Sequence, residues 1–193
     1  MFDKSKCRVV EKFDDLGRLE ERIWKSMHSD APHRQNGPAF EKFDPESGKL
    51  ISSIWIDQRN GGYHRGDGLP ALVQIDPVTG VVHNEEFYLS GIRDRPDGGP
   101  TKILRNRKSG LLVEQEFRVD GWLHRDDDLP AVMTYHEGSK QAARIEYHQG
   151  GVLHRDKGAA IVEFDETGNA ILTRYFQRGK EMTNRVPVLG PSC

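Results

Sequence analysis

Six arginines recur along this chain at an almost constant interval, and they constrain its fold more than any other feature. The steps between them are 31, 30, 30, 30 and 30 residues, at Arg34, Arg65, Arg95, Arg125, Arg155 and Arg185. A period near 30 residues indicates one supersecondary unit that is copied and stacked, because a single unit cannot bury its apolar surface alone. The sequence therefore predicts a repeat array.

Each copy has the pattern of two strands joined by a tight turn. Apolar and polar residues alternate after a proline-alanine step, as from Ala71 to Ile75, and this period of two is typical of a half-buried strand. A turn such as Asp76-Pro77-Val78-Thr79-Gly80 follows, with aspartate, proline and glycine where hairpin turns favour them. We expect six β-hairpins, at about residues 8–25, 38–58, 70–89, 100–119, 130–148 and 159–178.

A large apolar residue stands seven positions after each turn glycine. These residues should form one stripe that packs between successive hairpins: Trp24, Trp55, Phe87, Phe117, Ile145 and Tyr175. The amino-terminal copy belongs to the same frame, because residues 9–17 match residues 160–168 position for position. The fold class is therefore all-β: an elongated antiparallel meander or open β-solenoid, forming a single domain over residues 1–188 with a flexible tail at 189–193.

Composition favours a thin, well-solvated sheet. Charged residues make up 30% of the chain and apolar residues 35%, while the formal net charge is only −2. A protein that works mainly on a nucleic-acid backbone usually carries a basic excess, and this chain has none. No apolar leader follows Met1 and no apolar run is long enough to span a membrane, so we expect a cytoplasmic protein; export without a cleaved signal is the alternative.

The repeated histidine-arginine pairs allow a structural and a binding interpretation. Stacked copies would place equivalent arginines roughly 10–14 Å apart, which could track an extended polyanion. Aspartates follow the arginines closely, however, and a guanidinium can hold neighbouring carbonyls and carboxylates at a loop. We expect the structural role for His33, Arg34, His64, Arg65, His124, Arg125, His154, Arg155 and Arg185. The ligands of a metal ion must converge within about 2 Å of it, and equivalent histidines in stacked copies lie too far apart for that. No metal site is therefore expected.

No catalytic motif emerges from the chain. The triplet His124-Arg125-Asp126 resembles the start of a protein-kinase catalytic loop, but the glycine-rich phosphate loop and the Asp-Phe-Gly motif are missing. Neither a nucleophile elbow nor a Walker loop is present. We therefore expect a non-enzymatic protein without a cofactor.

Recognition of a partner should depend on residues that differ between copies, because the copied positions maintain the stack. Trp122 stands where other copies have Gly62, Ile92 and Val152, and Asp94 interrupts the histidine column beside Arg93. The expected partner surface is one edge of the sheet, with contacts from Trp122, Arg93, Asp94, Arg95 and Arg125.

The repeated unit resembles the MORN-variant repeats of bacteria, phages and giant viruses. The resemblance rests on Gly-x-x-His-Arg-x-x-Gly-Pro-Ala, a strand, an Asp-x-x-x-Gly turn and an aromatic residue, and it is clearest from Gly61 to Gly91 and from Gly121 to Ala160. It implies a meander of hairpins that binds or scaffolds without catalysis, and antitoxin-like relatives imply an inhibitor or immunity-type antagonist. The leading hypothesis is binding of another protein; polyanion binding through the arginines and an enzyme with an unrecognised site are the alternatives.

Overall fold

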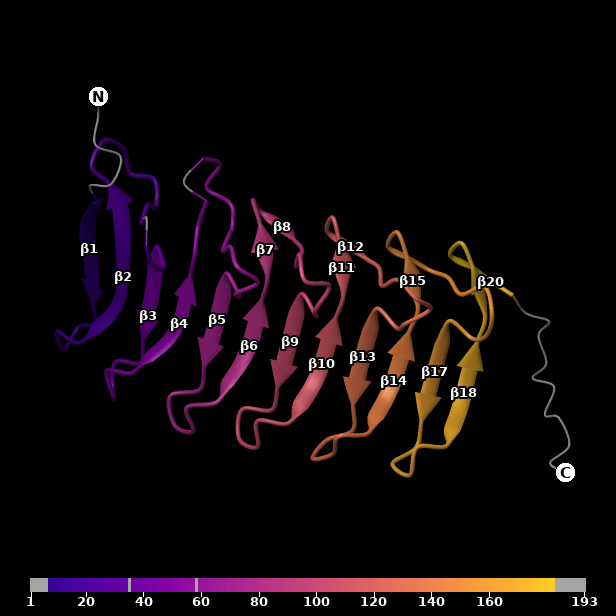
Figure 1. Cartoon of the computed structure of the whole chain (residues 1–193). Helices are drawn as coiled ribbons and strands as arrows, with labels where there is room; N and C mark the ends of the chain where they lie inside the picture. The colour runs from indigo at the N-terminus through magenta and orange to yellow at the C-terminus, as the bar shows by residue number, and fades with distance from the viewer. Residues whose placement is uncertain (1–6, 35, 58, 183–193) are drawn as a thin grey trace, which may run out of the picture.

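The chain folds into one open antiparallel sheet of 12 strands that follow one another in the order of the sequence. The computed structural model describes residues 7–34, 36–57 and 59–182. Six hairpins stand side by side in a single row, and the first and the sixth hairpin lie at opposite ends of that row (Figure 1). The predicted all-β meander of about six hairpin repeats is confirmed.

The main sheet is built from six pairs of strands, each pair joined by a tight turn. The pairs are β1 (Cys7–Phe13) with β2 (Leu19–Ser26), β3 (Phe40–Phe43) with β4 (Leu50–Ile54), β5 (Leu72–Ile75) with β6 (Val82–Glu86), β9 (Lys102–Arg105) with β10 (Leu112–Glu116), β13 (Val132–Tyr135) with β14 (Ala142–Glu146), and β17 (Ile161–Phe164) with β18 (Ala170–Arg174).

The hairpin turns have the predicted chemistry. In the third hairpin the Asp76 carboxylate accepts the backbone N–H groups of Val78 and Thr79 at 3.1 and 2.8 Å, and Gly80 has a φ of 74°. The Thr79 N–H is the largest influence on this carboxyl, and the pKa of Asp76 lies below its ordinary value. The side chain that opens the turn thus also holds it in shape.

Short two-stranded ribbons follow four of the hairpins, a feature that the sequence analysis did not anticipate. They are β7 (Tyr88–Leu89) with β8 (Ile92–Arg93), β11 (Arg118–Val119) with β12 (Trp122–Leu123), β15 (His148–Gln149) with β16 (Val152–Leu153), and β19 (Phe176–Gln177) with β20 (Lys180–Glu181). Each ribbon turns over two residues with positive φ, as at Asp120 (51°) and Gly121 (83°). Two positive-φ residues are the mark of a type I′ turn, whose twist suits a two-residue hairpin.

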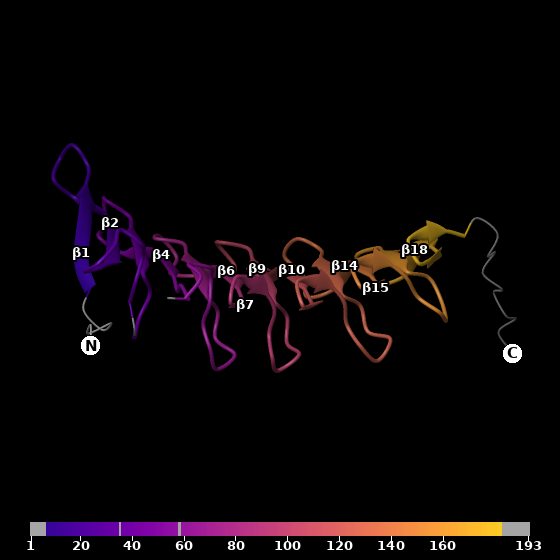
Figure 2. The same cartoon turned by 90° about the horizontal axis from the view of Figure 1, so that it is seen from above.

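The sheet has two long edges of different construction. The hairpin turns form one edge, here called the turn edge, and the ribbons lie along the other (Figure 1). A junction loop that carries the repeated arginine runs from each ribbon to the next strand, and in the first two copies it follows an isolated bridge (Lys25 with Pro32, Ile56 with Tyr63). The described parts of five such loops are residues 33–34 and 36–38, 64–70, 94–100, 124–130 and 154–159. Ribbons and junction loops together are called the junction edge. Seen from above, the row of hairpins is one layer that twists along its length (Figure 2).

The core is thin and lies where successive hairpins meet. The stripe of large apolar residues predicted from the sequence is present and is here called the aromatic row. Phe87 and Phe117 of this row are buried, and small residues such as Ala71 and Ala131 are also fully buried. The fifth member of this row is Tyr147 and not the predicted Ile145. Tyr147 donates its N–H to Ala160 as Phe117 does to Ala131, and it lies nine residues after Gly138 because that glycine comes two positions earlier in its turn. Counting from the glycine therefore misplaced the anchor by two residues.

Candidate functional site

The repeated arginines lie on the aromatic row, one arginine over one ring in every described copy. Each guanidinium carbon is close to the centre of the ring beneath it: Arg34 over Trp24 at 3.8 Å, Arg65 over Trp55 at 3.8 Å, Arg95 over Phe87 at 4.0 Å, Arg125 over Phe117 at 3.7 Å and Arg155 over Tyr147 at 3.7 Å. A cation in this position is attracted by the negative face of the ring. Arg185 lies outside the described residues.

The same guanidinium groups also hold the backbone that enters the next strand. Nη1 of each arginine donates to a backbone carbonyl just before the next strand of the main sheet. The acceptors, in chain order, are Pro38 (3.2 Å), Pro70 (3.2 Å), Pro100 (3.3 Å), Pro130 (3.4 Å) and Ala159 (3.4 Å). Each arginine therefore ties the aromatic residue of one hairpin to the start of the next. This geometry leaves the column facing its own chain, with the stacked face of each guanidinium closed to a ligand.

The repeated histidines join one junction loop to the following ribbon. Nδ1 of His64, His124 and His154 accepts the backbone N–H of Ser90, Gly150 and Arg178 at 3.1, 3.3 and 3.2 Å. His33 donates its backbone N–H to the carbonyl of Trp24, and Asp94, which replaces the histidine, donates in the same way to Phe87. Through these contacts the residues of the histidine column connect neighbouring parts of the junction edge.

The aspartates near the arginines are not equivalent partners. Arg95 pairs with Asp97 of its own loop at 2.8 Å, whereas Arg155 donates from Nε and Nη2 to both oxygens of Asp128, in the preceding loop, at 2.9 Å each. Asp126 and Asp156 lie against histidines instead, at 3.0 and 3.3 Å from Nε2 of His124 and His154. Arg65 and Arg125 have no carboxylate partner in the part of the chain that the structure describes, and burial lowers the pKa of both.

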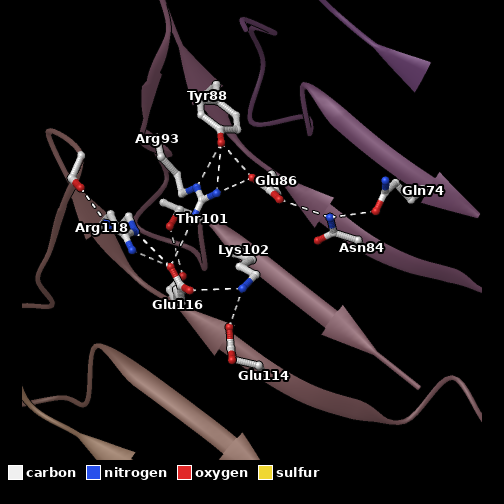
Figure 3. A network of polar contacts seen from close by, with 11 residues as sticks. Gln74, Asn84, Glu86, Tyr88, Arg93, Thr101, Lys102, Glu114, Glu116 and Arg118 are labelled. Carbon is white, nitrogen blue, oxygen red and sulfur yellow. Dashed lines mark hydrogen bonds and ion pairs between the residues drawn. The ribbon is translucent and has the colours of Figure 1, made fainter. Parts of the chain in front are cut away.

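Arg93, predicted to contact a partner, lies in a polar network with side chains of β6, β7, β9 and β10 (Figure 3). Its guanidinium contacts the Glu86 carboxylate, the Tyr88 hydroxyl at 3.0 Å and Glu116 at 3.3 Å, and its side chain is 23% exposed. Glu116 also accepts from Arg118 at 2.8 Å. Arg93 is therefore engaged within the sheet.

The network balances its own charges. Arg93, Lys102 and Arg118 face Glu86, Glu114 and Glu116, which gives three positive and three negative groups. Burial alone would raise the pKa of Glu86 and of Glu116, but donors from their neighbours outweigh it, and both pKa values lie below the ordinary glutamate value. The opposite charges of the cluster are therefore matched, which offsets the cost of burying them between the strands.

Trp122 is the most exposed member of an apolar ladder on the ribbons. Its side chain is 63% exposed, and the same ladder contains Ile92 (50%), Val119 (45%) and Val152 (45%). The Trp122 ring lies against the next ribbon, because a Cβ added at Gly151 would be 2.7 Å from its Cε3 atom. The sequence analysis aligned Ile92 and Val152 with Trp122 but expected only Trp122 of the three to contact a partner; the exposure of all three places them on one surface.

Shallow grooves separate successive junction loops. The groove between the first two loops is about 600 Å³ and includes Arg34, Asn36, Trp55, Arg59 and Arg65. The groove between the last two described loops is about 320 Å³, and Asp126, Asp127, Asp128 and Asp156 border it. Grooves that lie between equivalent junction loops of different copies therefore differ in charge along the array.

Neither a group of metal-binding side chains nor a membrane-spanning helix is found among the described residues. Within residues 7–34, 36–57 and 59–182, no three histidine, cysteine, aspartate or glutamate side chains are grouped to hold a metal ion. No helix in that same part of the chain is long and apolar enough to cross a membrane. Comparison with known proteins finds no matching family model, no matching curated protein and no matching solved structure.

Proposed function

We propose that this protein is a non-enzymatic binding module that recognises another protein through the junction edge. The observation that carries the proposal is the apolar ladder formed by Ile92, Val119, Trp122 and Val152 on neighbouring ribbons. Exposed apolar side chains grouped on one surface are typical of a protein contact, and tryptophan is enriched among the residues that dominate such contacts. The MORN-variant resemblance supports a binding role, of which an inhibitor or antitoxin-like antagonist is the narrower form.

The orientation of the arginines argues against the polyanion alternative. Each described repeat arginine stacks on a ring and donates to its own backbone, while the side chains of Asp97, Asp126 and Asp156 are 53%, 81% and 80% exposed at the same edge. An anionic polymer approaching the junction edge would meet these carboxylates first. Retention on a heparin column that falls steeply with salt would support the polyanion alternative instead.

Site-specific photo-crosslinking tests the proposal. A photoreactive residue at position 152 samples the ladder, and one at Val78, which is 86% exposed on the turn edge, is the matched control. Incubated with an extract of the producing cells, the position 152 protein should crosslink to one discrete protein, and the position 78 protein should not. Trp122→Ser should reduce the crosslink. Equal crosslinking from both edges, or a yield that Trp122→Ser leaves unchanged, would contradict recognition through the ladder.

A further inference from the structure

Arg65 and Arg155 have the same surroundings in two copies of the unit but differ in one respect. Both stack on an aromatic ring, at 3.8 and 3.7 Å, and both donate from Nη1 to a carbonyl before the next strand. Nε and Nη2 of Arg155 bind the Asp128 carboxylate, which projects from the preceding junction loop. The corresponding Nε and Nη2 atoms of Arg65 have no acceptor within the described residues. The Arg155–Asp128 pair therefore shows how a carboxylate binds to an arginine in this position of the repeat.

The preceding junction loop cannot supply the missing carboxylate to Arg65. Residues 33–38 include no aspartate or glutamate. Counted from the arginine, Gly37 takes the place of Asp128, and a Cβ at Gly37 would lie 2.6 Å from Nε of Arg34. A side chain at that position would therefore displace the first arginine from its stack.

The space in front of Arg65 is open and has an excess of positive charge. The groove of about 600 Å³ contains three arginines, of which Arg34 pairs with Glu41 at 3.6 Å and Arg59 pairs with Asp57 at 3.5 Å. Among the described residues that border the groove, Asp57 is the one acidic residue, and it also accepts from Ser90 at 3.2 Å. One positive charge, that of Arg65, remains without a partner.

Arg125 also has no carboxylate partner among the described residues, but its groove suits an anion less well. That groove is about 280 Å³ and is bordered by Asp126 and Asp127. Their charge disfavours an entering anion, because like charges repel at short range. The first groove is therefore the favoured position along the array.

We propose that the groove between the first two junction loops binds a carboxylate group, which pairs with Arg65 in the way that Asp128 pairs with Arg155. Planar guanidinium groups favour two parallel hydrogen bonds to a carboxylate, and Arg65 offers the same two donor atoms. Trp55 beneath the guanidinium fixes its plane. The carboxylate comes either from an acidic segment of a protein or from a free carboxylic acid; only the first source rests on the proposed function.

Nuclear magnetic resonance of the arginine Nε–Hε groups tests the site. The full chain is titrated with acetate at constant ionic strength, with chloride as the balancing anion, and Arg65→Lys assigns the Arg65 signal. The Arg65 signal and the Trp55 indole signal should shift and saturate, while the Arg155 signal, already paired with Asp128, should not move. A stationary Arg65 signal, or equal shifts for every arginine, would overturn the proposal.

Asp128→Asn provides the reciprocal control. It removes the charge of the internal carboxylate at a half-exposed position, so the Arg155 signal should begin to respond to acetate in this variant. If Arg155 remains unresponsive while the Trp and Arg signals show a folded protein, the comparison between the two grooves is wrong.

A triglutamate peptide, with trilysine as the control, then identifies the source of the carboxylate. Tighter binding of triglutamate than of acetate supports an acidic protein segment, and equal binding per carboxylate supports a free acid. A response to trilysine would overturn the assignment. Because the crosslinking position and Trp122 lie in other repeats, failure of this site and failure of the proposed function can be told apart.

Discussion

Replacing Arg125 by alanine should destabilise the sheet without any ligand being present. The change removes a guanidinium that lies 3.7 Å from the Phe117 ring centre and donates to the Pro130 carbonyl at 3.4 Å. A cation over a ring contributes about 0.5–2 kcal/mol, and one hydrogen bond contributes about 0.5–1.5 kcal/mol. The cost of burying a cation without a counter-ion opposes these terms, and we expect a net loss of about 2 kcal/mol in the free energy of unfolding.

Thermal unfolding followed by circular dichroism measures this loss. For a chain of this size 1 kcal/mol shifts the melting temperature by about 2–4 °C, so Arg125→Ala should lower it by about 4–8 °C. Arg125→Lys retains the charge but loses the planar group that covers the ring, and it should keep less than half of the stabilisation. Arg107→Ala is the matched control, because Arg107 is exposed on the turn edge and such changes stay within about 0.5 kcal/mol. An unchanged melting temperature for Arg125→Ala would refute the structural role of the column.

Three further changes test other parts of the structure. Several hydrogen bonds, of which the one from the Thr167 hydroxyl is the largest influence, lower the pKa of Asp165 from 3.8 to about 2. The stability that this carboxylate contributes is present above the unfolded pKa and should be lost as the pH falls from 3.8 to about 2. Asp165→Asn should therefore make stability less dependent on pH in acid unfolding curves. Gly151→Ala adds a Cβ at a φ of 85° and 2.7 Å from the Trp122 ring, which should cost about 2 kcal/mol in chemical denaturation; Trp122→Ala should relieve the steric part and leave the backbone part. Glu116→Gln leaves its cationic neighbours underpaired and should cost about 1–3 kcal/mol, a result contradicted by an unchanged denaturation midpoint.

The repeat period and the turn residues were enough to predict the hairpins. An aspartate that opens a turn and a glycine with positive φ act through neighbours in the chain, as Asp76 and Gly80 show. The same local logic failed in the fifth hairpin, where Gly138 occupies a different position of the turn and Tyr147 replaces Ile145 in the aromatic row. Register within a strand cannot be counted from one residue when the turn distributes its glycine differently.

Contacts between copies were harder to predict because they depend on how the loops fold back. The sequence indicated that arginines would support the junctions, but not that Arg125 would lie over Phe117, eight residues earlier. The sequence analysis expected carboxylates that closely follow the arginines to be their partners, whereas the structure pairs Arg155 with Asp128 in the preceding loop. Arg93 looked like a surface residue until the neighbouring strand placed Glu116 beside it.

Hydrogen–deuterium exchange of the protein with and without its crosslinked partner tests recognition through the junction edge most directly. The account predicts slower exchange of the ribbon amides in β7–β8, β11–β12 and β15–β16, with no change in the hairpin turns at residues 76–80 and 106–110. Slower exchange in those turns, with the ribbons unchanged, would contradict it.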